Sequence, residues 1–295
     1  MAVLATLATL AVLACGSLPP PPAEAAERVL YEGPAMFGRI FVSESDDRLR
    51  VLRFERYGAR QSAARIGMPD HFELPYTKVV LSSLGLVPEP RRMLVVGVGG
   101  GTLPMALHRY YPEARIDAVD IDPAVLDVAR KFFGFRESAH LRAHAADGRK
   151  YIEQVKEPYD LVYLDAFGAS SIPEHLTTEE FLKAVRAAVA PGGAVIANLW
   201  GRGSNMLFDA MVRTYQEVFE HVYTLPVAGS GNVILIATPR GPAFDAEAYL
   251  ARCRVAEQAR RFGFKPCEPG QFGFGQARLR DEHERVLRDT PAPAR

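Results

Sequence analysis

The chain has 295 residues, a length that suits one large domain or two modest ones and that allows a substantial buried core. Its 35 lysines and arginines match its 35 aspartates and glutamates, and 48% of its residues are hydrophobic. The neutral balance argues against a nucleic-acid-binding surface, and the hydrophobic content argues against a disordered chain. Three cysteines are too few for a disulfide framework or a paired-cysteine metal site, so no metal is expected. Cys253 and Cys267 are expected to be reduced or to form a single bridge.

The first 26 residues form a segment of their own, ahead of the folded chain. Met1–Leu18 contains no charged residue, and its apolar run has the length of a signal-peptide core. Four prolines follow at 19–22 and form a stiff spacer. The small residues around Cys15 resemble a bacterial lipobox, which implies an exported, lipid-anchored protein. An uncleaved membrane anchor and a mis-assigned start, which would leave the protein cytoplasmic, are the alternatives.

Short strand patterns come next, over residues 27–75. The runs 38–42 and 49–54 have strand composition, and a turn-rich break at Ser45-Asp46-Asp47 lies between them. We therefore expect a small β element ahead of the main fold.

From Tyr76 onward helix and strand patterns alternate, which predicts a parallel sheet with helices on both faces. Strand patterns at 222–227 and 232–237 are joined by four residues, too few for a helix, so this pair must be antiparallel. A doubly wound sheet that ends in an antiparallel hairpin is the layout of class I adenosylmethionine-binding, Rossmann-like α/β folds. We assign this domain to residues 76–240 and treat 241–295 as a helical and coil extension.

A glycine-rich loop follows the first strand of this sheet. Gly97, Gly99 and Gly101 let the backbone approach a ligand at the carboxyl edge of the sheet, where the next helix begins. Thr102 replaces the last glycine of the dinucleotide-binding pattern, which argues against a dinucleotide. Asp120 ends the second strand, where a carboxylate can accept hydrogen bonds from both ribose hydroxyls.

Acidic residues also end the third and fourth strands. Asp147 is placed to accept from an adenine amino group, and Gly148 lets the ring pass. Asp165 comes to the same edge at the end of the fourth strand, where such folds carry their chemistry. Asp122, which precedes Pro123, instead fits a helix cap. A nucleoside ligand accounts for these strand ends better than a set of unrelated caps and turns.

Several segments match one pattern when they are taken together. They are Gly38–Ile40, Gln61-Ser62, Tyr76, Leu94–Gly101, Val119–Pro123, Ala146–Arg149 and Tyr159–Asp165. Over about residues 31–237 the chain resembles spermidine synthases and related polyamine aminopropyltransferases. The resemblance implies that a polyamine such as putrescine receives an aminopropyl group from decarboxylated S-adenosylmethionine. That donor is a co-substrate, and no prosthetic group is implied.

The resemblance also implies roles for single residues. Asp165 is the expected catalytic base, while Tyr76 and Gln61 orient the substrates. Asp120 is expected to hold the ribose and Asp147 the adenine. The other residues expected around the nucleoside are Gly97, Gly99, Gly101, Ile121 and Gly148.

The chain departs from that family at two acidic positions. Gly100 stands where the family has the aspartate that meets the aminopropyl amine, and Gly168 stands where it has a second acid beside the catalytic one. Each missing carboxylate removes charge-assisted hydrogen bonds to a cationic amine. Candidates to replace them are Asp70, Glu73 and Glu174.

Three functions are therefore open. The leading one is aminopropyl transfer, and its rivals are methyl transfer from S-adenosylmethionine and non-catalytic binding of a polyamine or nucleoside by a membrane-anchored protein. The expected partners are small-molecule polyamine and nucleoside substrates, with no nucleic acid. A homodimer and membrane contact through the N-terminal segment are further expectations.

Overall fold

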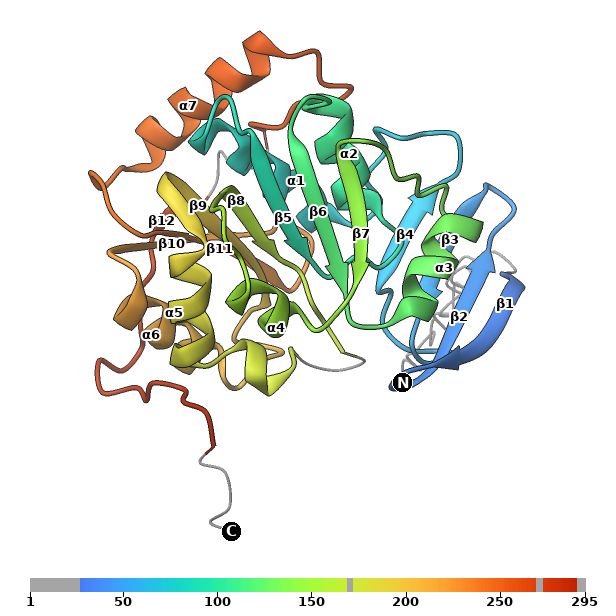
Figure 1. Ribbon diagram of the computed structural model, residues 1–295, viewed down its shortest axis with the longest axis horizontal. Coiled ribbons are helices and arrows are strands. Elements are labelled where there is room, and N and C mark those ends of the chain that lie inside the picture. Colours follow the sequence, from blue (N-terminus) through green and yellow to red (C-terminus); the bar gives the residue numbers. More distant parts are fainter. Residues whose placement is uncertain (1–26, 169–171, 269–272, 291–295) are drawn as a thin grey trace, which may run out of the picture.

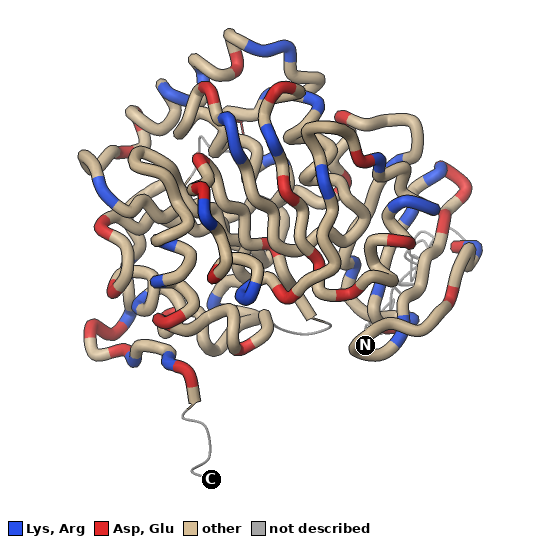
Figure 2. The backbone as a smooth tube through the Cα atoms, in the orientation of Figure 1, with Lys and Arg blue, Asp and Glu red and all other residues tan. Residues whose placement is uncertain are grey.

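The computed structural model of the protein describes residues 27–168, 172–268 and 273–290. The expectations for residues 1–26, including lipidation of Cys15, lie outside the described residues. Within these three ranges, no helix is both long enough and apolar enough to cross a membrane. Charged residues of both signs are interspersed along the backbone (Figure 2), and many pair locally, as Arg53 does with Glu27 at 2.9 Å.

A four-stranded antiparallel sheet precedes the main fold, as the strand patterns indicated. Its strands are β1 (Arg28–Ala35), β2 (Gly38–Glu44), β3 (Leu49–Arg53) and β4 (Ser62–Arg65), paired in that order. Ile40, Val42 and Leu52 point inward from this sheet and pack against Val125 and Val128 of helix α3 (Pro123–Phe132). Figure 1 shows the small sheet beside α3, at the end of the main sheet that carries β7 (Leu141–Ala145).

The main sheet has eight strands in the order β12-β10-β11-β9-β8-β5-β6-β7. The other strands are β5 (Arg92–Val96), β6 (Arg115–Asp120), β8 (Tyr159–Leu164), β9 (Val189–Trp200), β10 (His221–Pro226), β11 (Asn232–Thr238) and β12 (Gly275–Gln276). Strands β9, β8, β5, β6 and β7 are parallel to one another. Strand β11 lies between β9 and β10 and runs antiparallel to both. This confirms the predicted α/β fold, with a mostly parallel sheet that ends in an antiparallel hairpin.

Helices cover both faces of this sheet (Figure 1). One face packs α1 (Pro75–Ser82), the short η1 turn (Ser83–Leu86), α2 (Thr102–Tyr110) and α7 (Ala246–Ala259). The other packs α4 (Gly148–Glu153), α5 (Glu179–Ala187) and α6 (Phe208–Val218). Met93, Leu94 and Val95 of β5 are fully buried between the two layers, which is why that strand is a continuous apolar run.

The extension after residue 240 differs from the helix and coil expected for it. Its β12 pairs with β10 and becomes the edge strand of the main sheet. Tyr249 of α7 stacks on Phe274 at 4.3 Å between ring centroids, and both belong to the core. The sequence shows no strand pattern here because the strand is only two residues long and depends on the neighbouring β10 for its hydrogen bonds.

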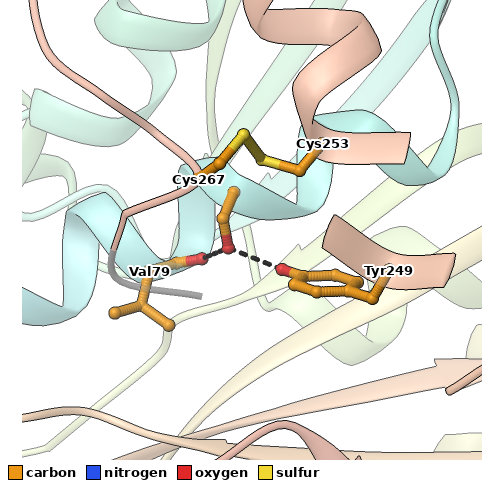
Figure 3. Close-up of a disulfide and its surroundings, with 5 residues drawn as sticks. Val79, Tyr249, Cys253 and Cys267 are labelled. Atoms are coloured by element: carbon orange, nitrogen blue, oxygen red, sulfur yellow. Dashed lines mark hydrogen bonds between the residues drawn. A yellow bond between two sulfur atoms is a disulfide. The ribbon is translucent and has the colours of Figure 1, made fainter. Parts of the chain in front are cut away.

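Cys253 and Cys267 form a disulfide, so the single-bridge alternative holds (Figure 3). The bond ties the segment that follows α7 back to α7, and α7 packs against η1. A Cβ atom at Gly85 would lie 2.5 Å from the Cys253 Cα atom, so the two backbones touch. Beside the bridge, the Tyr249 and Ser82 hydroxyls are 2.5 Å apart, and Ser82 also donates to the Val79 carbonyl (Figure 3).

Candidate active site

A cavity of about 390 Å³ opens at the carboxyl edge of the parallel strands, within the size range of small-molecule sites. Eight of the residues expected from the sequence line it: Gln61, Tyr76, Gly97, Gly99, Asp120, Ile121, Gly148 and Asp165. Gly101 and Asp147 do not belong to its lining. The small sheet, α1 and the strand ends thus converge on one site, although these residues are far apart in the chain.

The glycine loop is built around a close approach of two strands. Gly97 has φ +95°, and a Cβ atom there would lie 2.2 Å from the carbonyl oxygen of Asp165. Only glycine combines that backbone angle with that contact. Gly101 is the N-cap residue of α2, and its amide donates to the Val98 carbonyl of the loop at 2.8 Å.

Asp120 holds the loop from the neighbouring strand. Its carboxylate oxygens accept hydrogen bonds from the backbone amides of Val98 and Asp122, both at 3.0 Å. Burial raises the pKa of Asp120 above its ordinary value, and these amide bonds oppose the rise. Each oxygen keeps a free lone pair, so the predicted contact to ribose hydroxyls is compatible with this geometry.

Asp122 joins the small sheet to the main one. One oxygen caps α3 by accepting from the Ala124 amide at 2.9 Å, as the sequence indicated. The other accepts from the Met36 amide at 2.7 Å, a contact that the sequence did not indicate. The β1–β2 turn is thereby tied to the start of α3, and Phe37 of that turn lines the cavity.

Asp147 follows β7 and is the N-cap residue of α4. One oxygen accepts from the backbone amides of Arg149 and Lys150 and caps α4, and the other lies 3.3 Å from His175 Nε2. Its neighbour Gly148 does line the cavity, and a Cβ atom there would lie 2.4 Å from a methyl of Val96. The structure therefore gives Asp147 a capping role, and its contact with adenine stays a prediction.

Asp165 is a half-buried acid of the site and follows directly after β8. The Tyr76 hydroxyl donates to its Oδ2 atom at 2.9 Å, and the Asn198 amide donates to its Oδ1 atom at 2.9 Å. Burial raises the pKa of Asp165 to about 6, and the two hydrogen bonds limit the rise. Near neutral pH this carboxylate is ionised yet more basic than an exposed one, which suits a proton acceptor. Burial and the nearby carboxylate raise the pKa of Tyr76, so it remains a hydrogen-bond donor.

Two asparagines complete the surroundings of Asp165. The Asn198 Oδ1 atom accepts from the Asn232 side chain at 2.9 Å, which turns the Asn198 amino group toward Asp165. Both asparagines line the cavity, and Asn198 is buried. The sequence analysis missed them, although a lone polar residue near the end of the apolar strand at 194–199 was a usable signal.

An aromatic surface adjoins this polar group. Phe167 and Trp200 stack with their ring centroids 5.7 Å apart, and both line the cavity. Trp200 lies two residues after Asn198 in β9, so the two side chains emerge on the same face of the sheet. Trp200 also pairs with Asn232 across β11. Neither aromatic residue was singled out from the sequence.

The acids missing from the sequence pattern are not replaced within the described residues. A Cβ atom at Gly100 would lie 2.7 Å from the Ser62 hydroxyl oxygen and 2.9 Å from the Phe133 ring, so a side chain there would require these neighbours to shift. The candidate replacements Asp70, Glu73 and Glu174 do not line the cavity. Asp70 pairs with Arg109 at 2.6 Å and Glu73 lies 3.1 Å from His71. The described residues contain no cluster of three or more potential metal ligands.

The sequence of this chain is similar to those of known proteins. The family model described as "Spermine/spermidine synthase domain" matches residues 75–232. A polyamine aminopropyltransferase from Vibrio vulnificus is 34% identical over 216 residues, which are 71% of this chain and 71% of that protein.

Two solved structures share the fold. A probable spermidine synthase from Corynebacterium glutamicum has a TM-score of 0.67 at 17% identity, covering 90% of this chain and 98% of the other. Human methyltransferase-like protein 13, solved in complex with SAH, has a TM-score of 0.57 at 30% identity, covering 63% of this chain and 91% of the other. From the family match and the Vibrio relative we conclude that this chain is a transferase of the spermine/spermidine synthase family.

Proposed function

We propose that the protein transfers an aminopropyl group from decarboxylated S-adenosylmethionine to an amine, of which putrescine is the family's example. One observation carries the proposal: Asp165 lies half-buried at the carboxyl edge, between the Tyr76 and Asn198 donors, and has a pKa of about 6. A base at this position can take the proton that an amine must lose before it attacks. The Vibrio relative is named for the same class of reaction.

The proposed step is a displacement at carbon. The acceptor ammonium gives one proton to Asp165, and its nitrogen lone pair then attacks the methylene next to the sulfonium. The new C–N bond forms as the C–S bond breaks, and the bonding electron pair stays on sulfur as a neutral thioether. Asp120 holds the ribose of the donor through its remaining lone pairs, while Tyr76 and Asn198 keep the Asp165 carboxylate aimed at the amine.

Methyl transfer from S-adenosylmethionine is the second candidate. Gly100 favours it, because the acid that recognises the amine of the decarboxylated donor is absent from this crowded position. The human relative that was solved with SAH supports the same alternative. The two candidates use the same nucleoside pocket and base, and they differ in the group that moves.

One assay separates these candidates. Purified protein is incubated with each donor and a panel of putrescine, cadaverine, diaminopropane and spermidine, and the products are identified by mass spectrometry. Aminopropylated product supports the proposal, and methylated product supports the second candidate. Binding of methylthioadenosine in calorimetry without either product would leave a non-catalytic binding protein.

The same proposal extends to the location of the protein. The Cys253–Cys267 disulfide supports export, because disulfides persist in oxidising compartments. Lipid attachment at Cys15 would then place the domain at a membrane surface, with polyamine and nucleoside small molecules as its partners.

A further inference from the structure

The charge of the cavity restricts the acceptor. Three carboxylates line it within the described residues: Asp120, Asp122 and Asp165. Asp120 accepts from the backbone amides of Val98 and Asp122. Asp122 accepts from those of Met36 and Ala124, so both carboxylates are engaged on the nucleoside side. Only Asp165 is left to meet an incoming amine.

A linear diamine carries a second ammonium at its far end, and that charge needs an anionic or strongly polar partner once it leaves water. Within the described residues, the cavity lining offers no acidic side chain beyond Asp165 for that second charge. The two other side chains of its lining that can carry charge, Arg60 and His175, are basic groups.

Apolar surface lies next to Asp165. The Phe167–Trp200 stack adjoins the Asp165–Asn198 pair. Phe37, Phe54 and Leu74, from the small sheet and the segment after it, add further apolar lining. Such a surface gains free energy from contact with methylene, methyl or aromatic groups.

We infer that the acceptor of this enzyme is a monoamine with an apolar body, whose single amino group meets Asp165 and whose body lies on Phe167 and Trp200. The inference rests on the proposed function, because it assumes that an amine is the nucleophile. It names the chemical class of that amine and sets it apart from the diamines.

Two acceptors of the same length provide the test. Cadaverine and n-hexylamine each have an amino group followed by five methylenes. Cadaverine then ends in a second ammonium, whereas n-hexylamine ends in a methyl group. With the donor that supports turnover, kcat/KM for n-hexylamine is expected to exceed that for cadaverine by at least about tenfold. A preference for cadaverine would overturn the inference while leaving amine transfer in place.

Variants of Trp200 test whether its ring binds the apolar body of the amine. Trp200→Ala is expected to lower kcat/KM for n-hexylamine about tenfold or more, and Trp200→Phe to restore most of it. Tyr57→Ala, which removes an exposed aromatic residue outside the cavity, is the matched control and should leave the ratio of the two amines unchanged. Cadaverine use that depends on Trp200 would instead indicate a cation–π site for a diamine and would contradict the inference.

A binding measurement separates this inference from the proposed function. Each amine is titrated by calorimetry into the protein saturated with methylthioadenosine. Tighter binding of n-hexylamine supports the inference. A lack of turnover with both amines would count against the proposed transferase function and not against the inference. Tighter binding of cadaverine overturns it.

Discussion

Replacing Asn198 by leucine tests how the site sets the basicity of Asp165. The Asn198 amide donates to Asp165 Oδ1 at 2.9 Å and stabilises the ionised carboxylate. Leucine has a similar size and no donor, so the variant keeps the packing and removes one hydrogen bond. The base must be ionised to accept a proton, and activity is therefore lost as the pH falls through the pKa of Asp165.

The size of the effect follows from the bond that is lost. A hydrogen bond to a charged group contributes about 1.5–3 kcal/mol, and about 1.4 kcal/mol corresponds to one pH unit. The wild-type acidic limb of kcat/KM is expected near pH 6, where the pKa of Asp165 lies. In Asn198→Leu the limb should move up by about one to two pH units, while the rate at high pH stays close to that of the wild type.

The assay is kcat/KM against pH with saturating donor, with circular dichroism to show that each variant is folded. Asn205→Ala is the matched control, because Asn205 lies outside the cavity and its loss should leave the profile unchanged. Asn232→Leu should shift the limb in the same direction by a smaller amount, because Asn198 then loses the partner that orients it. An acidic limb that stays near pH 6 in folded Asn198→Leu would refute the assignment of Asp165 as the base.

Four further outcomes are expected. Asp165→Asn should lower turnover at least about a hundredfold while methylthioadenosine binding is retained, and near-normal turnover would count against the proposed base. Asp120→Ala should weaken nucleoside binding by roughly 2–3 kcal/mol in calorimetry, and an unchanged Kd would remove the ribose contact. Cys253→Ser, which opens the bridge to Cys267, should lower the free energy of unfolding by about 2–4 kcal/mol in urea titrations, whereas reductant should then have no further effect. Cys15→Ser should abolish palmitate labelling and release the protein from the membrane fraction, and labelling that persists would indicate another anchor.

The sequence by itself determined the parts of this protein that depend on local pattern. The apolar run at Met93–Val96, the glycines after it and the aspartates at the following strand ends specify a parallel sheet with a ligand edge. The short connection before Asn232 specifies the antiparallel hairpin. These features are legible because each one rests on the alternation and length of neighbouring residues, and strand ends of a parallel sheet meet at one edge whatever the details of packing.

Only the tertiary structure decided which polar side chains meet at that edge. Asn198 and Asn232 are 34 residues apart, and Tyr76 and Asp165 are 89 apart, so no local pattern links them. A carboxylate also has several possible partners. The Asp147 carboxylate accepts hydrogen bonds from the first amides of its own helix, so it has donors without a ligand. The pairing of a buried donor with a buried acceptor is a property of the packed fold, because burial is what makes an unpaired group costly.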